Sequence, residues 1–115
     1  MKLLLAVFLL AETWNGYLVD AGCFASQERN VNPFDGNFNT NHDRGYEVRV
    51  CRPSATTRSF TLVGSDGAVF ELDSAGNQKA AELVRQTGRQ QVFSVTVTGE
   101  KHKDTVTLDS ISVTR

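Results

Sequence analysis

Two short apolar runs on either side of an Asp-Gly pair constrain the fold of this chain more than any other feature. The runs are Phe60 to Val63 and Ala68 to Leu72, and they are separated by Gly64-Ser65-Asp66-Gly67. An Asp-Gly pair readily adopts the positive φ angles of a tight turn, and apolar runs of this length are typical of strands. The sequence therefore predicts a β-hairpin over Ser59 to Leu72.

Three further segments carry strand patterns. Aromatic and β-branched residues predict a first strand over Thr13 to Ala21, ended by Gly22. Apolar and polar residues alternate from Val92 to Thr98, as in a half-buried strand. A last strand follows the turn at Gly99 to Asp104. Its apolar residues occupy every second position, at 106 and 108 and then at 111 and 113, so the alternation shifts by one residue near Asp109-Ser110. Such a shift predicts a β-bulge there.

One segment has the pattern of an amphipathic helix. Residues 77–86 place alanine, leucine and valine on one face and charged or amide side chains on the other. Asn77 is expected to cap its start and Gly88 to end it. Residues 46–52 alternate weakly and fit either a short strand or a short helix, which Pro53 would end.

The order of these elements predicts the architecture. A helix between the third and fourth of five strands is the element order of an OB-fold barrel. We therefore expect a mainly β chain, a small OB-fold-like five-stranded barrel with one helix between strands 3 and 4. The length of 115 residues is that of one domain, and no internal repeat is present.

The N-terminus has the layout of an export signal. Met1-Lys2 is followed by the apolar run Leu3 to Ala11, as in secretory signal peptides. The run is shorter than the roughly 20 residues that a membrane-spanning helix needs. We expect a signal peptide over residues 1–11, one OB-like domain over residues 12–115 and a secreted or periplasmic location, although a buried first strand or helix remains the alternative for this run.

The two cysteines, Cys23 and Cys51, both follow this segment. In an oxidising compartment a single pair of cysteines most simply forms one disulfide bond. Such a bond would stabilise a small domain by roughly 3 to 4 kcal/mol. Two buried free thiols are the alternative.

An asparagine-rich stretch between the cysteines is a candidate metal site. Residues 24–45 show no sustained hydrophobic period and predict a long loop. Oxygen-bearing side chains recur there at every second position, a spacing that lets a loop wrap a calcium ion. The candidate ligands are Asp35, Asn37, Asn39, Asn41 and Asp43.

The match to a calcium loop is incomplete, and a plain surface loop is the alternative. A calcium loop of the EF-hand type has a glycine at its sharp turn, and this chain has Thr40 at that position. The last ligand of such a loop is a glutamate, and Glu47 lies one residue beyond the position that it would need. Asparagine side chains also bond to their own backbone in Asx-turns, which explains their abundance in loops without any metal.

Composition argues against several functions. The 12 Lys and Arg residues are balanced by 13 Asp and Glu residues, so no overall positive field attracts nucleic acid or an anionic membrane. No nucleophile elbow, nucleotide fingerprint or paired-carboxylate pattern is present. We therefore expect neither an enzyme nor a nucleic-acid-binding protein.

OB-type barrels commonly bind ligands across strands 2 and 3 and the loops that join strands 1 to 2 and 4 to 5. In this chain these are residues 24–58, the Ser59 to Leu72 hairpin and the turn at 99–104. The candidate ligand-binding residues are Phe34, Phe38, Lys101, His102 and Lys103. The two phenylalanines have an alternative role as anchors of the loop, and the basic turn as an ordinary solvated turn.

Several short motifs resemble those of a known group of proteins. Gly16-Tyr17-Leu18-Val19-Asp20 with Cys23, the hairpin from Asp66 to Asp73, and Val95-Thr96-Val97-Thr98-Gly99 are similar to segments of small exported, uncharacterised bacterial proteins with an OB-fold-like core. That group typically carries more cysteines before its hairpin. The resemblance implies a fold and a compartment but no reaction, so we expect an exported non-enzymatic domain that binds a protein, glycan or small molecule, with a calcium-type module as the alternative.

Overall fold

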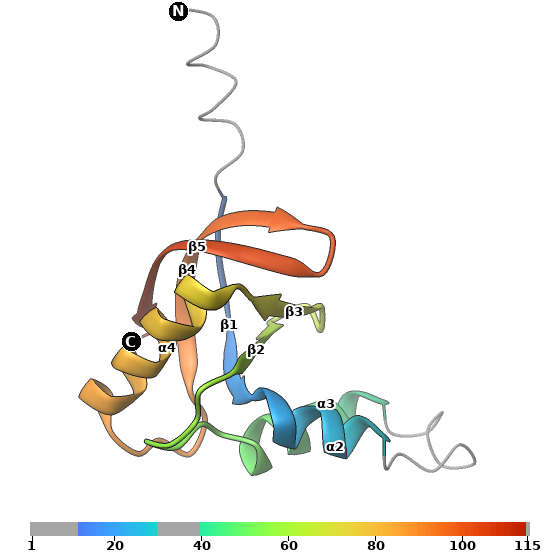
Figure 1. The fold of residues 1–115 in the computed structure, drawn as a ribbon. Coiled ribbons are helices and arrows are strands. Elements are labelled where there is room, and N and C mark those ends of the chain that lie inside the picture. The colour runs from blue at the N-terminus through green and yellow to red at the C-terminus, as the bar shows by residue number, and fades with distance from the viewer. Residues whose placement is uncertain (1–11, 30–39, 115) are drawn as a thin grey trace, which may run out of the picture.

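Five strands close into a barrel in the order β1-β2-β3-β5-β4 (Figure 1). The computed structural model describes residues 12–29 and 40–114. The strands are β1 (Glu12–Asp20), β2 (Phe60–Gly64), β3 (Val69–Leu72), β4 (Ser94–His102) and β5 (Thr105–Val113). β1 pairs antiparallel with both β2 and β4, and a parallel pairing of β3 with β5 closes the barrel. The predicted OB-like five-stranded barrel and its hairpin are confirmed.

Helix α4 (Ser74–Thr87) lies between β3 and β4, as the sequence predicted, but it begins earlier than residue 77. Asp73 rather than Asn77 caps it, because the Asp73 carboxylate accepts a hydrogen bond of 2.7 Å from the Gly76 amide. Asn77 instead accepts a bond of 2.9 Å from the Phe60 amide. This contact ties the helix to the start of β2. Gly88, with φ of 84°, ends the helix as predicted.

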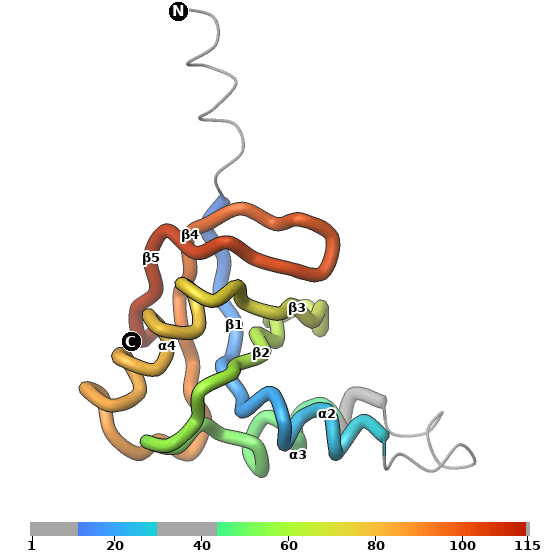
Figure 2. Tube along the Cα trace, in the orientation of Figure 1, coloured from blue at the N-terminus to red at the C-terminus, as the bar shows by residue number. Residues whose placement is uncertain are grey.

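Two helices replace most of the long loop expected over residues 24–45. Helix α2 (Ala21–Arg29) follows β1 directly, and helix α3 (Thr40–Val50) precedes β2. The two helices lie together below the barrel in Figures 1 and 2. The loop prediction was therefore wrong for residues 24–29 and 40–45, while residues 30–39 lie outside the described part of the chain. Residues 46–50, for which strand and helix were both open, are helical.

The start of α2 explains why the predicted first strand extends one residue too far. Asp20 is the last residue of β1, and its carboxylate accepts a hydrogen bond of 3.0 Å from the Cys23 amide. This bond satisfies one of the amides that have no partner within the first turn of a helix. The predicted strand through Ala21 thus ends at Asp20, and the chain turns into a helix.

The apolar residues form two separate clusters. The larger one fills the barrel with side chains from the strands and from Ala80 and Val84 of α4. The smaller one lies between the barrel and the two helices below it, where Val19 and Val63 of the strands meet Phe24 of α2 and Val48 of α3. The outer face of β1 and β2 is therefore covered by the segment that contains both cysteines.

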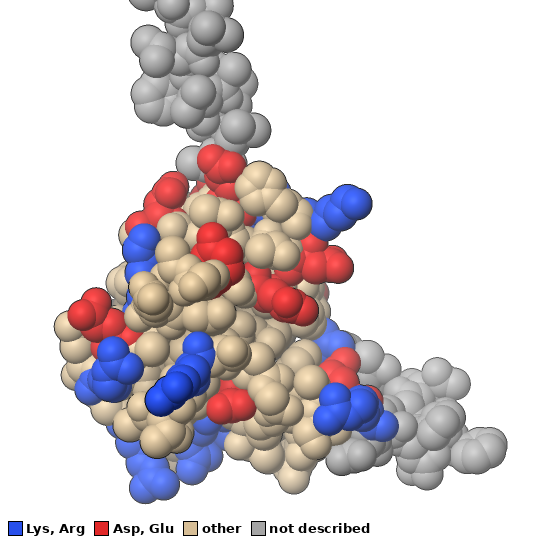
Figure 3. All heavy atoms as spheres, viewed as in Figure 1, with Lys and Arg blue, Asp and Glu red and all other residues tan. Residues whose placement is uncertain are grey.

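Charged side chains are unevenly distributed over the surface. In Figure 3, Lys and Arg gather over the lower end of α4 and along the lower edge of the view. Asp and Glu predominate in the upper half, around the β4–β5 hairpin. A chain whose formal charge is only −1 thus presents regions of opposite sign.

Candidate functional site

A disulfide bond fixes the helical segment next to the barrel. Cys23 and Cys51 are bonded, with their Cα atoms 5.4 Å apart, and no free cysteine remains among the described residues. Cys51 is 1% exposed, and its carbonyl accepts a hydrogen bond of 2.7 Å from the Asp20 amide. The predicted disulfide is confirmed, and it joins the first turn of α2 to the end of α3.

Arg44 of α3 connects the helices to the β2–β3 turn. Its Nη1 donates a hydrogen bond of 2.7 Å to the Gly67 carbonyl, and its Nη2 lies 3.5 Å from a carboxylate oxygen of Glu28. Its Nε lies 3.7 Å from the buried carboxylate of Glu47, and its guanidinium lies 5.7 Å from the centre of the Phe24 ring. One side chain thus contacts α2, α3 and the hairpin, which sets the distance between α3 and the barrel.

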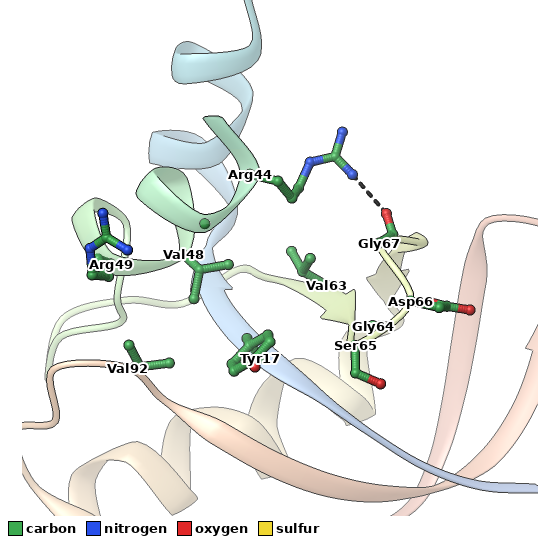
Figure 4. A pocket seen from close by; sticks show the side chains of 11 residues that line it. Tyr17, Arg44, Val48, Arg49, Val63, Gly64, Ser65, Asp66, Gly67 and Val92 are labelled. Carbon is green, nitrogen blue, oxygen red and sulfur yellow. Dashed lines mark hydrogen bonds between the residues drawn. The ribbon is translucent and has the colours of Figure 1, made fainter. Parts of the chain in front are cut away.

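A pocket of about 350 Å³ lies between α3 and the hairpin (Figure 4). Its apolar lining consists of side chains from β1, α3, β2 and the segment before β4, and its rim carries Arg44, Arg49, Ser65 and Asp66. Small-molecule sites in proteins typically combine a mostly apolar lining with a few polar groups. The apolar residues are Tyr17, Val48, Val63 and Val92.

The polar groups of this rim differ in whether they are free to form hydrogen bonds with a ligand. The Asp66 carboxylate already accepts a bond of 3.0 Å from the Ala68 amide within the turn. Arg49 is exposed, and no ion pair of its guanidinium is found in the described ranges. Because a guanidinium offers several donors and no acceptor, the free hydrogen-bonding capacity of the rim favours an anionic group.

The proposed calcium ligands are not assembled in the described part of the chain. Asp35, Asn37 and Asn39 lie outside the described residues, and Asn41 and Asp43 lie in α3 rather than in a loop. Residues 12–29 and 44–114 contain no group of three or more His, Cys, Asp or Glu side chains that could hold a metal ion. The calcium site stays a prediction for residues 35–39, and a loop through residue 43 is wrong.

The basic turn predicted as a ligand site is placed away from the pocket. Lys101 Nζ lies 4.5 Å from the centre of the Trp14 ring and 5.2 Å from that of Phe70. His102 Nε2 lies 3.2 Å from a carboxylate oxygen of Glu100. Lys103 occupies the turn itself with φ of 57°. These three residues do not line the pocket.

Phe34 and Phe38, the other candidate ligand-binding residues, lie outside the described residues. Sequence reasoning missed the residues that do line the pocket. Tyr17 and Val92 are far apart in the chain, and Arg44 fell within the expected loop. The hairpin signal located the rim at residues 64–67, but no local pattern could show which helix packs against it.

None of the helices within the described ranges is both long and apolar enough to cross a membrane. No family model, no curated protein and no solved structure matches this chain.

Proposed function

We propose that this chain is an exported, non-enzymatic binding domain that holds a small amphipathic molecule in the pocket between α3 and the β2–β3 turn. The observation that carries the proposal is the combination of an apolar lining with two arginines at the rim. The disulfide bond supports export, because such bonds persist in oxidising compartments.

The chemistry of the ligand follows from the two parts of the pocket. Tyr17 and Val92 line the pocket and are only half-buried, so covering their remaining apolar surface with an apolar group of the ligand is favourable. Arg49 stands at the rim and has no ion pair in the described ranges, whereas Arg44 is engaged by Gly67 and Glu28. A carboxylate or phosphate at the rim would form charge-assisted hydrogen bonds with Arg49. We expect a ligand with a short apolar body and one anionic group.

The pocket walls are held in place before any ligand binds. The disulfide bond fixes the end of α3, and the bond from Arg44 to Gly67 fixes α3 against the hairpin turn. A preformed site loses less conformational entropy on binding than a site that must be ordered first. The helical segment thus acts as one wall of a rigid pocket.

Titration by NMR with hexanoate and benzoate tests this function, with hexanamide and benzamide as uncharged controls. We expect saturable chemical-shift changes at the methyl groups of Val48, Val63 and Val92, and weaker binding of the amides. One exposed ion pair is worth up to about 1 kcal/mol, so the preference for the acid over its amide should be up to roughly fivefold.

Matched variants separate the pocket from general charge effects. Arg49→Gln should abolish the preference for carboxylates over amides, whereas Lys79→Gln on the exposed face of α4 makes the same charge change and should preserve it. Equal binding of acids and amides, or shift changes confined to other surfaces, would contradict the proposal.

A further inference from the structure

A second surface carries five arginines in adjoining hollows. Three hollows of about 770, 410 and 640 Å³ share lining residues from one to the next. They follow the path between residues 46–59 on one side and α4 with residues 88–91 on the other. We call this surface the arginine groove, and its arginines are Arg49, Arg52, Arg58, Arg85 and Arg89.

Within the part of the chain that the structure describes, no acidic side chain lines the groove beside these arginines. The described lining residues of all three hollows include no Asp and no Glu. The ion pairs found within the described ranges involve Arg44 and His102 and none of the five groove arginines. Between described residues, the guanidiniums make one hydrogen bond, from Arg52 Nη1 to the Arg49 carbonyl at 3.2 Å. Five cations are thus concentrated in one region of a chain whose formal charge is −1.

The wall formed by residues 51–59 is irregular in backbone but firmly anchored. The Ala21 amide donates a bond of 2.9 Å to the Ser59 carbonyl. The hydroxyl of Thr57, which is buried, donates a bond of 2.8 Å to the Asp20 carboxylate. With Cys51 in the disulfide and Pro53 buried, this wall presents Arg52 and Arg58 from a fixed backbone.

The opposite wall is equally well supported. Ala80 and Val84 anchor α4 in the barrel core, and Gly88 ends the helix with a bond of 3.0 Å to the Val84 carbonyl. Arg85 lies in the last turn and Arg89 directly after it. The groove therefore keeps its shape without a ligand. The positive charges of its five arginines repel one another, and a bound anion relieves this repulsion.

Arginine in this number points to repeated anionic groups. A guanidinium matches the planar fork of a carboxylate and the oxygens of a sulfate with paired hydrogen bonds. Several such groups in adjoining hollows fit a ligand whose charges recur along its length. A single small anion would engage one or two of the five arginines and leave the others unpaired.

The remaining lining residues indicate which class of charged polymer would fit this groove. Hydroxyl and amide side chains line the same hollows as the arginines and can bond to sugar hydroxyls, among them Ser59, Ser74, Gln78 and Gln91. Tyr46, which is 51% exposed, offers an apolar ring with a polar tip at one end. It is the sole aromatic side chain among the described lining residues, whereas single-stranded nucleic acids are held by stacking of successive bases on aromatic rings. A concave groove also suits one chain better than the plane of a membrane.

From these observations we infer that the arginine groove binds one chain of an acidic polysaccharide, with arginines on its carboxylates or sulfates and polar side chains on its hydroxyls. This site is distinct from the small-molecule pocket, although Arg49 borders both.

Calorimetric titration of the intact protein tests the inference with a polygalacturonate oligomer, a heparin oligomer and a dextran oligomer of similar length. We expect binding of the two acidic oligomers, with an affinity that falls as salt rises because bound counterions are released. Dextran should not bind measurably. Comparison of the two acidic oligomers shows whether carboxylate or sulfate is preferred.

A pair of double variants shows whether the groove is the site. Arg52→Gln/Arg89→Gln should weaken binding about tenfold or more, because two charge-assisted contacts are lost. Lys79→Gln/Lys103→Gln makes the same change in net charge at exposed positions outside the groove and should leave the affinity within about twofold. Neither double variant removes a residue of the small-molecule pocket or of the barrel core, and the urea unfolding midpoint of each variant serves as the check of folding.

The inference is overturned by any of four results. The first is that neither acidic oligomer binds at low salt, and the second is that both double variants lose the same affinity for these oligomers. The third is that single-stranded DNA binds more tightly than the acidic oligomers. The fourth is that the protein binds phosphatidylglycerol vesicles and not the soluble oligomers. Success or failure here is independent of the small-molecule pocket, because the two sites are tested by different ligands and different variants.

Discussion

Gly99 in β4 lies where the pairing of β4 with β5 changes register. Thr98 pairs with Ser110 and Gly99 with Leu108, so Asp109 is left over as the bulged residue. This confirms the bulge that the change of parity predicted. A side chain at residue 99 would collide with the Thr107 carbonyl oxygen and lie 3.1 Å from the Leu108 Cα atom. The bulge thus requires a glycine on the opposite strand because of close approach.

Gly99→Ala should therefore lower the free energy of unfolding by about 1 to 3 kcal/mol, the usual cost of overpacking. Gly45→Ala is the matched control, because Gly45 is exposed in α3 and a Cβ atom there would meet nothing closer than Arg49 Nη1 at 4.0 Å. Removing a helical glycine should stabilise the fold by about 0.5 to 1 kcal/mol. Urea unfolding of both variants measures these opposite effects, and a neutral Gly99→Ala would show that the bulge can rearrange.

Helices α2 and α3 depend on cross-links more than on their own sequences. Each has few buried apolar residues, and their packing against the barrel relies on the small cluster around Val63 and on the disulfide bond. Short helices are marginal in water unless tertiary contacts support them. The disulfide bond and the Asp20 cap supply that support at the first turn of α2.

Cys23→Ala/Cys51→Ala should lower the free energy of unfolding by about 3 to 4 kcal/mol, because the unfolded chain gains the freedom of an open loop. The loss is measured by urea unfolding, and reductant added to the wild type should produce a similar shift. Hexanoate affinity should fall as well, since α3 forms one wall of the pocket. Unchanged stability and binding without the bond would show that packing alone holds α3 in place.

The whole molecule is a barrel with a smaller helical unit attached to one face. The barrel core contains eleven buried residues, and the cluster beneath it contains five. Because local opening is easiest where few apolar side chains are buried, the two parts should differ in their resistance to opening.

Amide hydrogen exchange should show this difference in local stability between the barrel and the helical unit. We expect the slowest amides in β1, β2 and β4, and faster exchange in α2 and α3. Reduction of the disulfide should accelerate exchange in the two helices by at least about tenfold, the effect of a loss of some 1.4 kcal/mol in local stability, while the strand amides change less. Uniform acceleration across both parts would mean that the molecule unfolds as a single unit.

Local patterns were sufficient for much of the barrel. The Asp-Gly turn and Gly88 after the helix each act over a few neighbouring residues, and both were placed correctly. The alternation located β4, but this strand begins at Ser94 rather than Val92 and continues to His102, through most of the segment predicted as a turn. The start of α4 was placed too late because Asp73 and Asn77 are both good caps, and the bond from Asn77 to Phe60 exists only once the hairpin and helix are packed together. Helix α2 and residues 40–45 of α3 were missed, and residues 46–50 were left open between strand and helix, because these sequences lack a clear apolar stripe.

The amino-acid sequence sets the number and order of the strands, the turn chemistry and the pairing of the cysteines, because these depend on periodicity, backbone preference and composition. The pocket and the arginine groove depend on folding. Tyr17, Val48, Val63 and Val92 belong to segments far apart in the chain, and so do Arg52 and Arg89. A balanced count of charges hides the groove, since net charge is a sum over the whole chain whereas binding responds to the field at one surface. That field is established by the closed barrel, which brings residues 46–59 opposite α4.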